Sequence, residues 1–154
     1  MPELVLFQPD IPGNTGTLLR LGACFGVKIH IIEPTGFRLD EKAFRRAGMD
    51  YVDQAIMSRH LDWNAFEQWR KDENRRLILL TTKANDVYME FAFEKSDLLM
   101  LGRESSGVPD HIHDEADAAL KIPMQPEARS LNMALSGAIV LAEAMRQTDT
   151  LPVD

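Results

Sequence analysis

The amino-acid sequence predicts an α/β domain in which helices flank a parallel β-sheet. Short apolar runs alternate with helical segments along the chain, and several of these runs are continuously apolar, which is typical of parallel strands covered on both faces. The length of 154 residues fits a single domain, residues 1–154, without internal repeat or linker. The expected strands are Leu4–Phe7, Val27–Ile32, Leu77–Thr81, Leu98–Leu101 and Ala118–Ile122.

The expected helices lie between these strands, as the crossover connections of a parallel sheet require. Asn14 is the predicted N-cap of the first helix, because its side-chain oxygen can accept a hydrogen bond from the first turn. Gly26 is the predicted end of that helix, and Ser130 the predicted N-cap of the last. The four expected helices cover Thr15–Phe25, Glu41–Ala47, Asp62–Lys71 and Leu131–Gln147.

Composition excludes several classes of protein. Hydrophobic residues make up 45% of the chain and charged residues 27%, values that exclude wholesale disorder. The single cysteine, Cys24, excludes an internal disulfide framework and a cysteine-rich zinc site. No apolar run approaches the ~18 residues of a membrane span, and no secretory signal is evident. We therefore expect a cytoplasmic protein with no membrane partner.

One histidine-containing segment has the composition of a metal site. Residues 110–114 read Asp-His-Ile-His-Asp, but histidines two positions apart share a face only on a strand, and Pro109 predicts a turn or a helix start. We expect a solvated loop there and no bound metal.

Three loops with unusual composition each follow a predicted strand, which is where ligands bind in open α/β sheets. The first, residues 8–16, leads into the helix that carries Arg20, and an ordinary strand–helix turn explains it on spacing alone. The second, residues 101–109, contains two glycines and could wrap a nucleoside, although a surface turn explains it equally well. The third, residues 122–132, is stiffened by two prolines.

The last predicted helix is apolar on nearly every side from Leu131 to Ala142, where only Asn132 and Ser136 are polar. Such a helix should be buried almost all round. We favour burial against the sheet on one face and a second subunit on another, over a simple core helix.

A local basic cluster interrupts an otherwise acidic chain with a net charge of −7. Lys42, Arg45 and Arg46 are spaced i, i+3, i+4, so they would share one side of a short helix and could contact phosphates. A solvated face is the alternative interpretation.

Taken together, the three loops resemble the motifs of SPOUT-class RNA 2′-O-methyltransferases, and within that class the YibK-type (TrmL-like) branch that methylates tRNA cytidine or uridine. The resemblance covers the chain from Leu4 to about Arg146. Further matches to that branch lie in residues 31–37, 45–51 and 81–83. The motif residues are Asn14-Thr15-Gly16 with Arg20, Gly102-x-Glu104-x-x-Gly107, Ile122-Pro123-Met124 and Arg129-Ser130-Leu131-Asn132.

The resemblance implies a fold and a set of partners that composition does not reveal. It implies a deep trefoil knot near the C-terminus, an obligate homodimer, S-adenosylmethionine as cofactor and tRNA as substrate, with the wobble nucleotide of the anticodon loop as the methylated site. Knots are otherwise almost absent from proteins. The implied cofactor-binding residues are Leu80, Thr81, Gly102, Ile122, Ser130 and Leu131.

The resemblance also implies four catalytic residues: Arg20, Asn14, Glu104 and Asn132. Because a guanidinium has no acceptor lone pair, we interpret Arg20 as a clamp on the ribose or an adjacent phosphate and not as a general base. In this hypothesis Asn14 holds Arg20, and Glu104 pairs with Arg20 or Arg129. Lys42, Arg45 and Arg46 are the expected RNA-binding residues.

The chain departs from the pattern of this branch in two places. The branch commonly has Asn-Leu-Ser-Asn after the third-motif serine, whereas residues 132–135 here read Asn-Met-Ala-Leu, and a tyrosine that supports RNA binding in some relatives is Ala142. Two other functions stay open from the sequence: ribose methylation of ribosomal RNA, and a catalytically silent dimeric nucleotide-binding or regulatory module.

Overall fold

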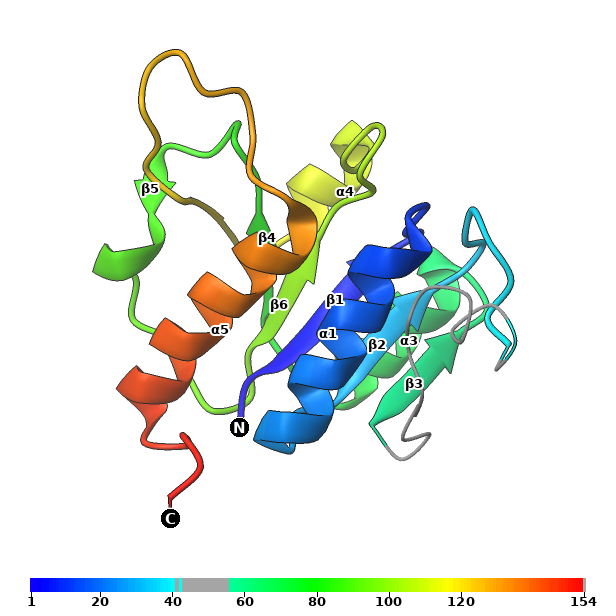
Figure 1. Cartoon of the computed structure of the whole chain (residues 1–154). Helices are drawn as coiled ribbons and strands as arrows, with labels where there is room; N and C mark the ends of the chain where they lie inside the picture. The colour runs from blue at the N-terminus through cyan, green and yellow to red at the C-terminus, as the bar shows by residue number, and fades with distance from the viewer. Residues whose placement is uncertain (41, 43–55, 154) are drawn as a thin grey trace.

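The computed structural model describes residues 1–40, 42 and 56–153, and places seven parallel-paired strands in one sheet. The strand order is β3-β2-β1-β6-β4-β7-β5, with β1, β6 and β4 at the centre (Figure 1). The strands are β1 (Glu3–Phe7), β2 (Ile29–Ile32), β3 (Met57–His60), β4 (Leu77–Leu80), β5 (Asp86–Val87), β6 (Leu98–Leu101) and β7 (Ala118–Lys121).

All five predicted strands are confirmed, each to within two residues at either end. The edge strands β3 and β5 were not expected from the sequence. Strand β3 carries Ser58, Arg59 and His60, and β5 has only two residues. A strand at the edge of a sheet is covered less than a central one, so it lacks the continuous apolar run that marks the buried strands.

Helices cover both faces of the sheet, so the fold has three layers (Figure 1). Successive residues of β1 point to opposite faces: Leu4 and Leu6 pack with α1 and α5, whereas Val5 and Phe7 pack with α3 and α4. The described helices are α1 (Pro12–Phe25), α3 (Trp63–Asp72), α4 (Asp110–Glu115), α5 (Met133–Thr148) and a 3₁₀ turn at Tyr88–Glu90. None of them has the length and apolar composition of a membrane span.

Two predicted helix starts are wrong by a few residues. Helix α1 begins at Pro12, whose fixed φ suits the first helical position, so Asn14 lies inside the first turn. Helix α5 is capped by Asn132, whose Oδ1 accepts hydrogen bonds from the backbone of Ala134 and Leu135, and Ser130 lies two residues earlier. The predicted end of α1 at Gly26 is confirmed by its left-handed backbone (φ 68°).

Two other expectations concern single segments. Residues 110–114 belong to α4, and not to the solvated loop expected, because Ile112 anchors the short helix in the core. The expected helix Glu41–Ala47 lies outside the described residues except for Lys42, which is helical and exposed.

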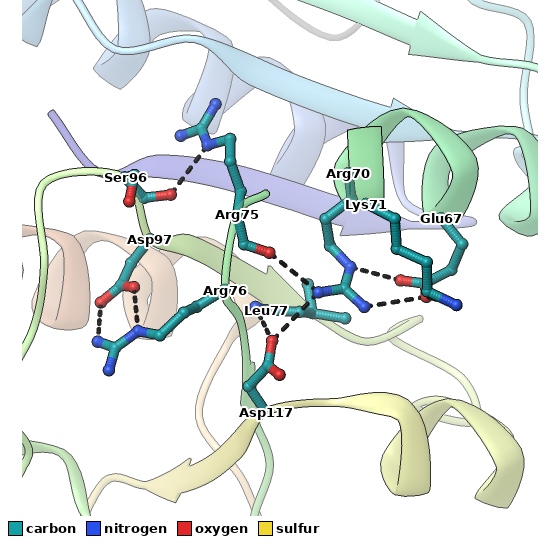
Figure 2. A network of polar contacts seen from close by, with 9 residues as sticks. All are labelled: Glu67, Arg70, Lys71, Arg75, Arg76, Leu77, Ser96, Asp97 and Asp117. Carbon is teal, nitrogen blue, oxygen red and sulfur yellow. Dashed lines mark hydrogen bonds and ion pairs between the residues drawn. The ribbon is translucent and has the colours of Figure 1, made fainter. Parts of the chain in front are cut away.

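Ion pairs and hydrogen bonds connect the segments at the end of the sheet where the strands begin (Figure 2). Asp117, just before β7, accepts hydrogen bonds from the backbone nitrogen of Leu77 (2.7 Å) and from Arg70 (3.1 Å). Arg76, just before β4, forms two hydrogen bonds of 2.7 Å with the fully buried carboxylate of Asp97. Because the strands are parallel, these contacts gather at one edge, and the loops that follow the strands gather at the opposite one.

Candidate functional site

A cavity of about 540 Å³ lies at the carboxyl edge of the sheet, where β4, β6 and β7 end. Leu80, Leu101 and Leu120, from the ends of these three strands, form its apolar floor. Residues 81–83, 102–108, 122, 124 and 130–133 contribute to its walls. In Figure 1 the loop after β7 arches away from the sheet before α5 begins. The volume is within the range of small-molecule sites.

The structure brings the six predicted cofactor-binding residues together in this one cavity. Three of the four predicted catalytic residues, Asn14, Glu104 and Asn132, also line it, whereas Arg20 does not. The six residues are Leu80, Thr81, Gly102, Ile122, Ser130 and Leu131.

Tight packing of the loop after β6 explains its glycines. A Cβ on Gly102 would lie 2.9 Å from the backbone of Gly107, and Gly107 itself has a positive φ of 67°. Arg103 and Gly107 exchange two backbone hydrogen bonds of 3.0 and 2.7 Å, so the loop folds back on itself. This shape places the backbone of residues 102–107 along the cavity wall.

Asn14 and Asn132, 118 positions apart, are joined at the rim of the cavity. Asn132 Nδ2 donates to Asn14 Oδ1 at 2.9 Å. Because Asn132 Oδ1 already accepts from two backbone nitrogens of α5, the orientation of its amide is determined by the network. Among the described residues Asn14 contacts Asn132 and not Arg20, because a spacing of six residues places Arg20 on another side of α1.

Arg20 is exposed on α1 and has no hydrogen-bond or ion-pair partner among the residues described. Of the expected RNA-binding residues, Lys42 is exposed, and Arg45 and Arg46 lie outside the described residues.

Glu104 contacts the loop after β1 and neither of the arginines expected to pair with it. Its Oε2 accepts a hydrogen bond of 2.8 Å from the backbone nitrogen of Asp10, and Arg103 Nε donates to Asp10 Oδ2 at 3.2 Å. The neighbouring side chains of Glu104 and Ser105 lower the pKa of Asp10 to about 2. Burial of Glu104 and the adjacent side chain of Asp10 raise the pKa of Glu104.

Sequence reasoning missed several residues of the site. Asp10 lies in the predicted loop of residues 8–16, and nothing in the local sequence indicates its contact with Glu104, 94 positions away. Asp110 and His113 line the cavity from α4. The Asp-His-Ile-His-Asp pattern contains both residues, but its spacing predicts a solvated loop and not the helix that carries them to the cavity. The residues described hold no group of three side chains arranged to bind a metal ion.

Helix α5 leaves an apolar strip uncovered in the single chain. Leu135 is 57% exposed and Ile139 37% exposed, and Leu131 continues the strip toward the cavity. Two departures from the motif pattern, Leu135 and Ala142, lie on this exposed face.

Comparisons with known proteins place the chain among RNA methyltransferases. It is 52% identical over 145 residues to a tRNA (cytidine(34)-2′-O)-methyltransferase of Ancylobacter novellus, covering 94% of this chain and 92% of the relative. It is 41% identical over 149 residues to the protein of the same name from Escherichia coli K12, covering 96% and 94%.

A solved structure described as "Structural insights into the 2-OH methylation of C/U34 on tRNA" superposes with a TM-score of 0.88 at 35% identity, covering 96% of this chain and 95% of the other. The model of the SpoU rRNA Methylase family matches residues 1–142. The chain therefore belongs to the SpoU rRNA Methylase family.

Proposed function

We propose that this protein transfers a methyl group from S-adenosylmethionine to the ribose 2′-oxygen of nucleotide 34 of tRNA, a cytidine or uridine. The observation that carries the proposal is the convergence of three separate loops on one cavity, in a chain that covers most of the length of tRNA (cytidine(34)-2′-O)-methyltransferases. With tRNA as the substrate, the proposed place of action is the cytoplasm.

The cofactor would lie across the ends of β4, β6 and β7. Backbone groups at Thr81, Gly102 and Ile122 offer donors and acceptors there, and the side chains of Leu80 and Leu131 offer apolar contact for an adenine ring. When bound, S-adenosylmethionine supplies an electrophilic methyl group on a sulfonium centre.

Arg20 would orient the acceptor. Transfer breaks the bond between sulfur and the methyl carbon and forms a bond between that carbon and the ribose oxygen, which must approach to ~3–3.5 Å in line. A guanidinium carries five fixed donors, so it can hold a phosphate or ribose oxygen and stabilise the developing charge. In this role the hydroxyl proton leaves to a phosphate or to water, because Arg20 has no lone pair to accept it.

The active unit in this proposal is a homodimer with a trefoil knot in each chain. The exposed apolar strip on α5 supports the proposal of a second subunit, because an apolar strip of this kind is typical of a protein–protein interface. A dimer would present Lys42, Arg45 and Arg46 of two chains to one tRNA, which compensates for the acidic net charge of −7.

Ribose-methylation mapping tests the proposal in the cell. We expect RNA from a strain that lacks this protein to lose 2′-O-methylation at tRNA nucleotide 34, and a plasmid copy to restore it. Loss at a ribosomal position with nucleotide 34 still methylated would contradict the proposal.

A further inference from the structure

Two buried carboxyl oxygens beside the cavity have no hydrogen-bond donor among the described residues: Asp10 Oδ1 and Glu104 Oε1. Buried polar atoms of this kind are nearly always paired, because losing water without a replacement is costly. The other oxygen of each group is satisfied, since Glu104 Oε2 accepts from the Asp10 backbone and Asp10 Oδ2 accepts from Arg103. The two unsatisfied atoms therefore need a donor that two ionised carboxylates cannot provide.

We propose that one proton lies between Glu104 Oε1 and Asp10 Oδ1, and that Asp10 is a positioning residue that keeps Glu104 a neutral carboxylic acid in the cavity wall. The geometry matches such an acid on both oxygens. Glu104 Oε2 accepts from an N–H, as the carbonyl oxygen of an acid does, whereas the buried Oε1 has no donor and is the oxygen that would carry the hydroxyl proton. One proton then satisfies both unpaired oxygens.

The surroundings decide which carboxyl group keeps the proton. Arg103 lies 3.2 Å from Asp10 and favours the anion there, so the proton stays on Glu104. The pKa shifts agree, since the pKa of Asp10 falls to about 2 while burial raises that of Glu104. The side chain of Ser105 also favours the anion at Asp10. The other titratable side chains lining the cavity are Lys83, Asp110 and His113, and none of them contributes to either shift.

The pair connects three loops that follow different strands. Gly36, from the loop after β2, donates to the backbone of Pro9 at 2.9 Å, and a Cβ on Gly36 would lie 2.7 Å from that of Asp10. Asp10 is thus packed tightly just before α1 begins, and Glu104 belongs to the loop that lines the cavity. The shared proton therefore ties the cavity wall to the start of the helix that carries Asn14.

Losing the proton should loosen this connection. Two adjacent carboxylates repel each other, and the loop containing Gly102 would be pushed away from the loop after β1. We therefore expect the cofactor loop to lose order as pH rises through the raised pKa of Glu104. This last step rests on the proposed function, whereas the shared proton itself does not.

Carboxyl ¹³C NMR of the ligand-free protein tests the proton directly. We expect the Glu104 carboxyl to titrate above the ordinary glutamate value of 4.5 and Asp10 to titrate near 2. Glu104→Gln identifies the Glu104 signal by removing it. Asp10→Asn should move the Glu104 titration downward, because the neighbouring anion is replaced by an amide that can donate to a carboxylate. A wild-type Glu104 that titrates at or below 4.5, or one that Asp10→Asn leaves in place, would overturn the proposal.

Calorimetry with S-adenosylmethionine across the same pH range tests the positioning role. Wild-type affinity should weaken as Glu104 ionises, whereas Glu104→Gln, whose amide can make the same two hydrogen bonds, should show no such pH dependence. Glu73→Gln, an exposed change remote from the cavity, should follow the wild type. A wild-type affinity for S-adenosylmethionine that does not change as Glu104 ionises would refute the positioning role. Absence of cofactor binding at every pH, with the NMR titrations as expected, would refute the proposed function and leave the shared proton standing.

Discussion

At the scale of single residues, Arg20 differs from the other predicted catalytic residues because nothing in the described chain holds it. Asn14, Glu104 and Asn132 are fixed by hydrogen bonds at the cavity, whereas Arg20 is exposed and does not line it. An unpartnered exposed arginine suits a group that meets its partner only when a polyanionic substrate arrives. Arg20 therefore has its proposed role on the acceptor side of the reaction.

Replacing Arg20 should separate transfer from cofactor binding. We expect Arg20→Ala to lower the rate of methyl transfer by ~10²–10³-fold, the usual effect of losing a donor that stabilises developing charge. Arg20→Lys should be nearly as slow, because an ammonium lacks the planar fork. Single-turnover assays measure the rate and calorimetry the cofactor affinity, which should stay within about twofold. Arg146→Ala, an exposed arginine on α5, is the matched control. A lysine variant with near-normal turnover would refute the clamp.

At the scale of elements, α5 has two faces with different requirements. One face packs against the sheet through residues such as Val140 and Leu141, which are fully buried. The other carries Leu135 and Ile139, which remain exposed in the single chain. This division agrees with the sequence-based interpretation of a helix that needs two covers, and the second cover is the proposed subunit.

Charged substitutions on the exposed face of α5 test that interface. We expect Leu135→Glu and Ile139→Glu to convert a dimer to monomers, because each would bury a carboxylate against an apolar partner. Sedimentation equilibrium measures the mass. Leu61→Glu provides the control, since Leu61 is 78% exposed and lies far along the chain from α5. If Leu135→Glu and Ile139→Glu both have the mass of the wild-type dimer, the interface lies elsewhere on the molecule.

The elements also show what the sequence can and cannot predict. Strands β1, β4 and β6 were predictable because burial on both faces requires an uninterrupted apolar run, as in Leu77–Leu80. Strand β3 was not, because its edge position tolerates Arg59. The predicted cofactor-binding residues, which line the cavity, followed from motif positions. The contacts of Asn14 with Asn132 and of Asp10 with Glu104 did not, because long-range pairings depend on how the loops meet in space.

At the scale of the whole molecule, a series of buried and half-buried polar side chains crosses the face of the sheet opposite α1 and α5. Arg75 contacts Glu3 at 2.8 Å, Glu3 contacts His30 at 2.6 Å, and His30 contacts His60 at 3.0 Å, beside the ring of Trp69. Burial, and secondarily the nearby His30, lower the pKa of His60 from 6.5 to about 4.

Acidification should therefore weaken the fold before the acidic residues titrate. Between pH 6.5 and about 4, His60 is protonated in the unfolded chain but stays neutral in the folded chain. The free energy of unfolding therefore falls as the pH falls through this range. We expect a loss of ~2 kcal/mol between pH 7 and pH 5. Urea unfolding at the two pH values measures it, and His60→Phe should abolish most of the difference. Equal stability of the wild type at both values would contradict the lowered pKa.

Binding of tRNA by an acidic protein requires a concentrated cationic surface. We expect the double variant Arg45→Ala, Arg46→Ala to bind tRNA more weakly and to reduce the magnitude of the slope of log affinity against log salt by about 1–2. The reason is that fewer phosphate contacts release fewer counterions when the tRNA binds. Filter binding across a salt series measures the slope, and cofactor affinity should not change. An unaltered slope in the double variant would move the RNA surface to another part of the molecule.

Methyl transfer by the purified protein shows whether the chain acts on the ribose of tRNA nucleotide 34, as its proposed function requires. The measurement uses labelled S-adenosylmethionine with a tRNA carrying cytidine at position 34, and with the same tRNA carrying 2′-deoxycytidine there. The proposed function predicts one methyl group per tRNA, mapped by mass spectrometry to the 2′-oxygen of nucleotide 34, and none on the deoxy substrate. Equal labelling of both tRNAs, or labelling at another nucleotide, would contradict it.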